Sequence, residues 1–281
     1  MAAIEMTDAM TSAMTNTVLA AGVPVRLSWA KASEAGARAA NQDVIGAAVD
    51  DELACFALAD GTGGHHGGEV ASRIAVDAVI KAFRAAPAFG ARALLSYAAG
   101  ATSKVAAARR ADPQLADMST TVAALLIDSQ AGRAVWAHLG DSRVYLFRAG
   151  RVHAVTTDHS LAQQLIDAGY ASAGALRLHP QRNILLAAIG AEGDFAVVAS
   201  DEVALEAGDA LLVCSDGLWE WVLEDEMEQA LSATAGSEDW LAALCARADA
   251  AVGAAGAAGK ARDNYSAYAI RVHPPLREQA A

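Results

Sequence analysis

The sequence contains few cysteines and little positive charge, and each shortage excludes a class of protein. Only three cysteines, Cys55, Cys214 and Cys245, occur among 281 residues, with no CxxC spacing. This count argues against a disulfide framework or a zinc ribbon and favours a reducing compartment. Lysine and arginine number 21 against 33 aspartates and glutamates, a net charge of −12. Such a chain repels nucleic acid and anionic membranes, so neither is an expected partner.

The sequence also lacks a long hydrophobic run. The N-terminal stretch has no positively charged segment and carries Glu5 and Asp8, so it is not a signal peptide. The longest uncharged run, 9–25, includes five Ser, Thr or Asn residues. It therefore falls short of the roughly 20 predominantly apolar residues of a membrane span. We expect a soluble, cytoplasmic protein.

Hydrophobic residues make up 54% of the chain, enough for a sizeable core. Alternating and apolar runs predict strands at 25–30, 44–49, 53–59, 121–127, 134–139, 144–147, 210–214 and 267–272. Helical periodicity appears at 69–84, 91–110, 160–168, 224–232 and 237–252, with Ser237 and Asp239 as candidate caps of the last helix. The Ala/Gly run 253–259 predicts a loop. Short turns between strands favour antiparallel pairing and an α+β fold.

Aspartates recur where the predicted strands begin or end. Asp60-Gly61, Asp216-Gly217 and Gly140-Asp141 follow apolar runs, while Asp43 and Asp263 precede others. A single Asp-Gly is an ordinary turn signal. Repeated carboxylates at strand ends would converge, and buried like charges are costly unless cations neutralise them. Hard divalent ions with oxygen ligands are the natural partners.

The glycine-rich segment 60–69 is unusual for a simple connection. It lacks the lysine of a phosphate-binding P-loop, and His66 stands where a dinucleotide fingerprint needs glycine. Zinc binding by the adjacent His65 and His66 is disfavoured, because consecutive side chains rarely face one ion. No GxSxG occurs, so Ser142 is not an expected nucleophile.

Eight short motifs follow one another along the chain. They are Arg38–Asp43, Ala59–His65 with Gly68–Ser72, Ser119–Thr121, Gly140–Arg143, Asp158–Ser160, His179–Asn183, Ser215–Leu218 and Asp263–Asn264. In this order the chain resembles bacterial members of the PPM or PP2C family of metal-dependent serine/threonine protein phosphatases. The resemblance implies a four-layer αββα sandwich of two antiparallel sheets flanked by helices. It assigns 24–274 to the phosphatase domain, with a flap at about 160–183, an N-terminal extension 1–23 and a tail 275–281.

The resemblance also implies two tightly bound Mn²⁺ or Mg²⁺ ions and a third, looser one. Asp60 would bridge the two ions, Asp216 and Asp263 would complete one site, and the Gly61 carbonyl the other. Asp141 and Asp216 would hold the third ion. A metal-bridging hydroxide would attack phosphorus directly. Gln42, Thr62 and the segment 186–190 depart from common family patterns, but none of them removes a metal carboxylate.

Three further residues receive roles in catalysis. Arg38 can bind phosphoryl oxygens bidentately, and Asp43 would hold a water beside the ions. His65 is the candidate acid for the leaving alkoxide, with a loop-bracing role as the alternative. By contrast, Asp158, His159, Ser160 and His179 are interpreted as turn and capping residues beside the flap, and Trp136, Trp219 and Trp221 as packing residues.

The predicted function is removal of phosphate from phosphoserine and phosphothreonine of a protein substrate. The enzyme would act as a monomer opposing a bacterial Ser/Thr kinase, including kinases of type VI secretion clusters. Two alternatives remain: a non-catalytic regulatory binding module, and a phosphatase for small phosphoesters or for a partner-switching protein of stress signalling.

Overall fold

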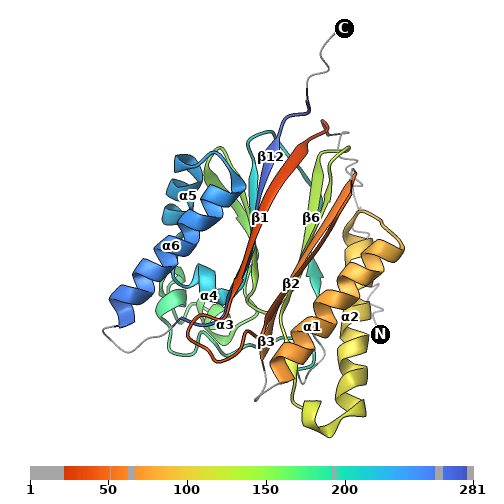
Figure 1. Ribbon diagram of the computed structural model, residues 1–281. Helices are drawn as coiled ribbons and strands as arrows, with labels where there is room; N and C mark the ends of the chain where they lie inside the picture. Colours follow the sequence, from red (N-terminus) through yellow and green to blue (C-terminus); the bar gives the residue numbers. More distant parts are fainter. Residues whose placement is uncertain are drawn as a thin grey trace, which may run out of the picture.

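The structure is a computed structural model that describes residues 22–50, 52–62, 67–191, 193, 195–256 and 262–276. Two antiparallel sheets lie face to face in it, and helices cover the outer face of each (Figure 1). The α+β sandwich expected from the sequence is therefore confirmed. Among the described residues, no helix has both the length and the apolar character that crossing a bilayer requires.

The first sheet has the strand order β1-β12-β11-β7-β8. Its strands are β1 (Arg26–Glu34), β7 (Arg143–Arg148), β8 (Arg151–Val155), β11 (Ala210–Cys214) and β12 (Tyr265–His273). The helices α4 (Asp216–Trp219), α5 (Glu224–Ala233) and α6 (Ser237–Gly256) lie on its side of the molecule. The first and last strands, β1 and β12, pair along their whole length.

The second sheet has the order β10-β6-β5-β3-β2, with β4 beside β3 and β9 beside β6. Its strands are β2 (Asp43–Val49), β3 (Leu53–Thr62), β4 (Ser119–Thr120), β5 (Val122–Asp128), β6 (Arg133–Leu139), β9 (Val198–Ala199) and β10 (Val203–Ala204). The long helices α1 (Gly67–Ala85) and α2 (Ala91–Ala111) cover it, and a short 3-10 turn, η1 (Pro113–Leu115), follows α2. Between β8 and β9 lie α3 (Leu161–Asp167) and the 3-10 helix η2 (Ala173–Leu178).

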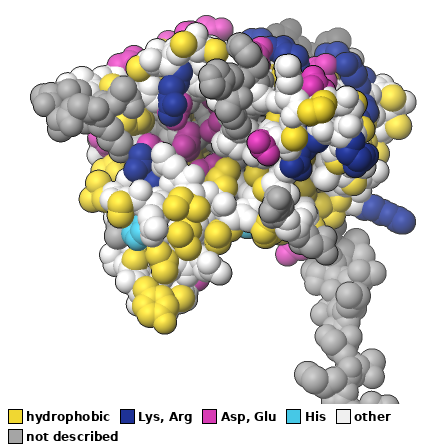
Figure 2. All heavy atoms as spheres, turned by 90° about the horizontal axis from the view of Figure 1, so that it is seen from below, with side chains coloured by type: hydrophobic (Ala, Val, Ile, Leu, Met, Phe, Trp, Pro, Cys, Tyr) yellow, Lys and Arg dark blue, Asp and Glu magenta, His cyan; other side chains and the backbone are white. Residues whose placement is uncertain are grey.

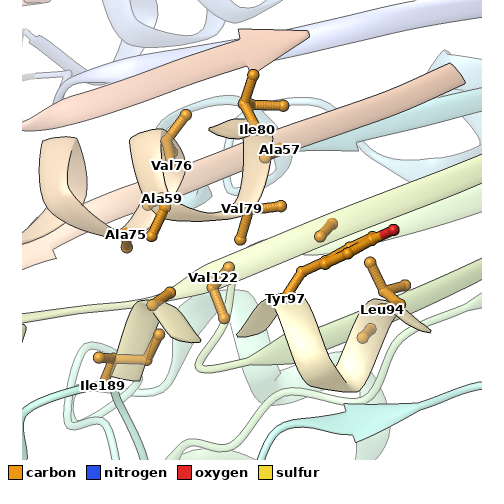
Figure 3. Close-up of a cluster of buried hydrophobic side chains, with 14 of the residues drawn as sticks. Ala57, Ala59, Ala75, Val76, Val79, Ile80, Leu94, Tyr97, Val122 and Ile189 are labelled. Carbon is orange, nitrogen blue, oxygen red and sulfur yellow. The ribbon is translucent and has the colours of Figure 1, made fainter. Parts of the chain in front are cut away.

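The period-two pattern of β3 explains how the layers are held together. Cys55, Ala57 and Ala59 face the helices, while Phe56 and Leu58 point between the sheets. Figure 3 shows the first of these cores, where small side chains of β3 meet Val76 and Val79 of α1. Alanine on both surfaces lets the helix approach the sheet closely. Both faces of β3 are buried from Ala54 to Ala59, so its sequence is continuously apolar there.

The structure corrects several expectations about individual elements. The helix α6 continues to Gly256, so the predicted loop at 253–259 is wrong over its first four residues. Alanine favours helix strongly enough to carry the helix through Gly253. Ser237 is a residue of α6 rather than its cap, and its hydroxyl donates to the Ser28 carbonyl of β1 (2.9 Å). The apolar pattern also missed β8, whose side chains alternate between exposed and half-buried.

Candidate functional site

The antiparallel register of β2 and β3 places Asp43 opposite Asp60. Asp43 is only 4% exposed, and the Ser215 hydroxyl donates to its Oδ2 (2.7 Å). Burial raises the pKa of Asp43 to about 6, against the lowering effect of that hydrogen bond. Its second oxygen, Oδ1, is buried with no hydrogen-bond partner.

Backbone contacts hold Asp60 in place, although its carboxylate has few partners. Its amide donates to Thr121 Oγ1 (2.9 Å), and its carbonyl accepts from the Thr121 amide (2.8 Å) and Thr120 Oγ1 (2.9 Å). Burial raises the pKa of Asp60 well above its usual range, and the charges of Asp43 and Asp216 raise it further. The strand β3 continues past Asp60 to Thr62, so this carboxylate lies within the strand rather than at its tip.

Gly61 and Gly68 pack backbone against backbone at the start of α1. A Cβ on Gly61 would lie 2.0 Å from the Gly68 carbonyl oxygen, and a Cβ on Gly68 would lie 2.7 Å from the Gly61 oxygen. Neither position admits a side chain, which explains the glycines at 61 and 68.

Asp141 lies in the turn between β6 and β7, which Gly140 enters with a φ of 105°. The Trp219 indole N–H donates to the Asp141 carbonyl (2.9 Å), and the Gly140 amide donates to His159 Nδ1 (3.1 Å). Asp141 is 6% exposed. Burial raises its pKa to about 7, with a further increase from the charge of Asp158 and an opposing effect of Arg143.

Asp216 is the first residue of α4, and its Oδ1 is buried with no hydrogen-bond partner. Burial raises its pKa well above the usual range, and the charges of Asp141, Glu220 and Asp263 add to the effect. An anion that is desolvated, surrounded by other acids and unpaired is unfavourable unless a cation approaches it.

Asp263 is held by Arg38, which lies 225 residues away in the chain. Arg38 Nη2 donates to Asp263 Oδ2 (2.5 Å), and the Asn264 amide donates to Asp263 Oδ1 (2.8 Å). The Arg38 side chain is 63% exposed. Asn264 ties the same segments together, because it accepts from the Gln42 amide and donates to the Ala35 and Ala40 carbonyls.

These residues line one cavity of ≈ 420 Å³ at the lower end of the sandwich. Figure 2 views this end and shows acidic side chains in a hollow. The lining residues are Arg38, Ala39, Ala40, Gln42, Asp60, Gly61, Thr62, Asp141, Asn183, Leu185, Asp216, Asp263 and Asn264. Of the eight site residues expected from the sequence, six line the cavity, Asp43 lies behind it, and His65 is outside the described residues.

The cavity fits divalent cations by its chemistry. It offers carboxylate and carbonyl oxygens, carboxyl groups whose pKa values are raised by burial and by one another, and the unpartnered Oδ1 of Asp216. Within the described residues, no three acidic, His or Cys side chains as placed would hold one ion by themselves. Arg38 engages one of the two oxygens of the Asp263 carboxylate.

Sequence reasoning missed the residues that support the site through ion pairs. Arg143 binds Asp158 bidentately (2.7 and 2.8 Å) and lies over the Trp219 ring. From the predicted flap, Arg177 and Arg182 pair with Glu224 and Glu220. The capping interpretation of Ser160 is confirmed, since its hydroxyl accepts from the Gln163 amide. Arg143, Asp158 and Arg182 stand in the sequence motifs, whereas Glu220, directly after α4, and Glu224, the first residue of α5, had no sequence signal.

Comparison with known proteins identifies the family. The family model for protein phosphatase 2C matches residues 32–258 of the sequence. The chain belongs to the protein phosphatase 2C family. It is 35% identical over 213 residues to the serine/threonine protein phosphatase PstP of Mycobacterium tuberculosis, covering 75% of this chain and 40% of PstP. The chain thus spans less than half the length of that relative.

One further relative and one solved structure match over most of their length. The serine/threonine phosphatase stp of Listeria innocua is 36% identical over 187 residues, covering 64% of this chain and 73% of the relative. The catalytic domain of PstP in complex with two manganese ions superposes with a TM-score of 0.74 at 28% identity, covering 89% and 99% of the two chains. The family resemblance inferred from the motifs is therefore confirmed.

Proposed function

We propose that this chain is a metal-dependent protein phosphatase that removes phosphate from phosphoserine and phosphothreonine. The observation that carries the proposal is the desolvated carboxylate cluster in an open cavity, where Asp216 has a buried oxygen without a partner. Buried acids without counter-charges destabilise a fold, so their presence at one end of this sandwich favours a binding role. Family membership supports the same activity.

Asp60, Gly61, Asp216 and Asp263 would hold two Mn²⁺ or Mg²⁺ ions, and Asp141 with Asp216 would hold a third. Bound there, the ions would acidify a water nucleophile and offset the charge of the phosphoryl oxygens. The carboxylates must be ionised to bind the ions. Because the pKa values of Asp60 and Asp216 are raised, the ions would compete with protons for these carboxylates. Asp43 would position a water through its unpartnered Oδ1.

Arg38 would have two roles in this scheme. Without cations it neutralises Asp263 at 2.5 Å. If Asp263 held a cation, Arg38 would no longer be needed to neutralise it, and its exposed guanidinium would be available to bind a substrate phosphoryl group. The geometry supports this exchange because Arg38 lines the same cavity and is 63% exposed.

Phosphate release from a phosphothreonine peptide, measured with Mn²⁺ and after EDTA dialysis, tests the proposal. We expect turnover with Mn²⁺ and none in EDTA. Full activity in EDTA would refute the two-metal scheme. Peptide binding without turnover, at saturating Mn²⁺, would instead support the non-catalytic module.

His65 remains the proposed acid for the leaving alkoxide. A serine alkoxide needs a proton, whereas p-nitrophenolate hardly does. We therefore expect His65→Ala to slow phosphopeptide hydrolysis much more than p-nitrophenyl phosphate hydrolysis. An equal loss on both substrates would identify a loop-bracing role.

At the level of pathway, we propose that the phosphatase acts as a cytoplasmic monomer that opposes a bacterial Ser/Thr kinase, with control of type VI secretion as one setting. The kinase or its target would be the phosphoprotein partner. Dephosphorylation of each Ser/Thr kinase of the same organism, followed by phosphopeptide mass spectrometry, tests the assignment. A kinase whose phosphorylation the enzyme does not change would contradict it.

A further inference from the structure

Arg262 is a buried arginine directly before the candidate metal ligand Asp263. It is 4% exposed, and its guanidinium carbon lies 3.3 Å from the centre of the Tyr265 ring. Its Nη1 donates to Asp249 of α6, and its Nε donates to the Gly217 carbonyl (3.3 Å). One side chain thus joins a helix, the start of β12 and the segment that carries Asp216.

The contact with Gly217 connects two ligand segments that are distant in sequence. Gly217 follows Asp216, and a Cβ on Gly217 would lie 2.0 Å from the Asn264 carbonyl oxygen. The backbones of 216–217 and 263–264 therefore touch, and Arg262 bridges them with a side chain. The Arg262 carbonyl also accepts from the Ala37 amide (3.0 Å), next to Arg38. Displacement of Arg262 would shift both carboxylates relative to each other.

An arginine suits this place for a geometric reason. Its planar guanidinium can stack on an aromatic ring while donating from its edge in two directions, which the single ammonium of lysine cannot do. The position is also costly, because Nη2 is buried without a hydrogen-bond partner. A hydrophobic residue would avoid that cost but would leave the Gly217 carbonyl without this donor, so the arginine is retained together with its link to the segment of Asp216.

We infer that Arg262 is a positioning residue that fixes the separation between Asp216 and Asp263 and thereby sets the cation affinity of this pair. The inference rests on the proposed function, since it assigns both acids to one cation site. Arg262 touches neither substrate nor reacting atoms. It acts through the Gly217 carbonyl and through its peptide bond to Asp263.

The test compares Mn²⁺ affinity, by isothermal titration calorimetry, among the wild type, Arg262→Lys, Arg262→Met and the control Asp249→Ala. Asp249 lies at the far end of the guanidinium and its side chain is 65% exposed. We expect both Arg262 variants to weaken one class of Mn²⁺ site by about tenfold or more, as for other groups that orient metal ligands. We expect Asp249→Ala to change affinity less than about twofold, because this variant keeps the bond from Arg262 to the Gly217 carbonyl.

A second readout separates positioning from general stability. The Tm of each metal-free variant and the Mn²⁺ dependence of kcat/KM are measured alongside affinity. A positioning role predicts that saturating Mn²⁺ restores most of the activity of Arg262→Lys. Wild-type Mn²⁺ affinity in a folded Arg262→Lys protein, with only a lowered Tm, would overturn the inference even if Arg262→Met fails to fold. Absence of Mn²⁺ binding by the wild type would instead refute the proposed function.

Discussion

Asp141 should make the metal-free protein less stable as the pH rises. Burial and the charge of Asp158 raise its folded-state pKa to about 7, against an ordinary value of 3.8. The folded state therefore keeps a proton that the unfolded chain has already lost. Below pH 4 both states are protonated, so the stability contributed by the retained proton is full there and is lost as the pH rises through 7.

The magnitude follows from these two pKa values. Because one pKa unit corresponds to 1.36 kcal/mol, raising the pH from 5 to 8 removes about 3 kcal/mol of stability through Asp141 alone. The carboxyl is only 6% exposed, so solvent screens this effect little. For a chain of this size the change corresponds to a Tm decrease of about 6 °C. The variant Asp141→Asn carries no proton to lose and escapes the decrease.

Guanidinium denaturation of EDTA-treated wild type and Asp141→Asn at pH 5, 6, 7 and 8 measures the effect. The variant should gain about 3 kcal/mol relative to the wild type across this range. Burial lowers the pKa values of His138 and His159, which makes stability rise with pH. The difference in stability between wild type and Asp141→Asn excludes the contribution of these histidines, because both proteins carry them. Parallel stability curves for the two proteins would refute the reasoning, and Mn²⁺ should restore wild-type stability most at pH 8.

Three further outcomes are expected. Asp216→Asn should lower kcat on a phosphothreonine peptide by about a thousandfold, the equivalent of about 4 kcal/mol. The circular dichroism spectrum should stay unchanged. Turnover near the wild-type value would contradict the proposed role of Asp216 as a ligand. Arg177→Ala removes the ion pair with Glu224 (2.6 Å), which is worth about 1 kcal/mol. This variant should speed proteolysis between 160 and 183 by about fivefold. The control Arg151→Ala, which removes an exposed pair, should leave the rate of proteolysis unchanged. Phe56→Ala should cost about 3–5 kcal/mol of unfolding free energy, because the ring is fully buried; a loss below 1 kcal/mol would show that the core collapses around the gap.

The fold was predictable from the sequence where side-chain pattern decides structure. Apolar runs such as 210–214 were found to the residue, because every position of that strand is buried. The short helix Asp216–Trp219 was not foreseen, since four residues carry no helical periodicity. The two-residue strands β9 and β10 were missed for the same reason. Their pairing depends on β6 rather than on their own sequence.

The site could be predicted in its residue types but not in its contacts. Ligation chemistry requires carboxylates and glycines, so Asp60, Gly61 and Asp216 were visible as residue types beside strands. Their supports act mainly on backbone atoms: Trp219 donates to the Asp141 carbonyl, and Arg262 to the Gly217 carbonyl. A backbone carbonyl leaves no signature of residue type, so its partner cannot be recognised by pattern.

The contact between Arg38 and Asp263 could not be predicted either, although both residues were. Each residue was predicted to serve the site, but for separate tasks, phosphate binding and cation binding. Bringing them within 2.5 Å depends on β1 pairing with β12 over nine residues, which places the ends of the two strands side by side. Motif order cannot specify such register. The proposed coupling between cation uptake and phosphate binding would therefore be a property of the tertiary fold, although both residues of the pair stand in sequence motifs.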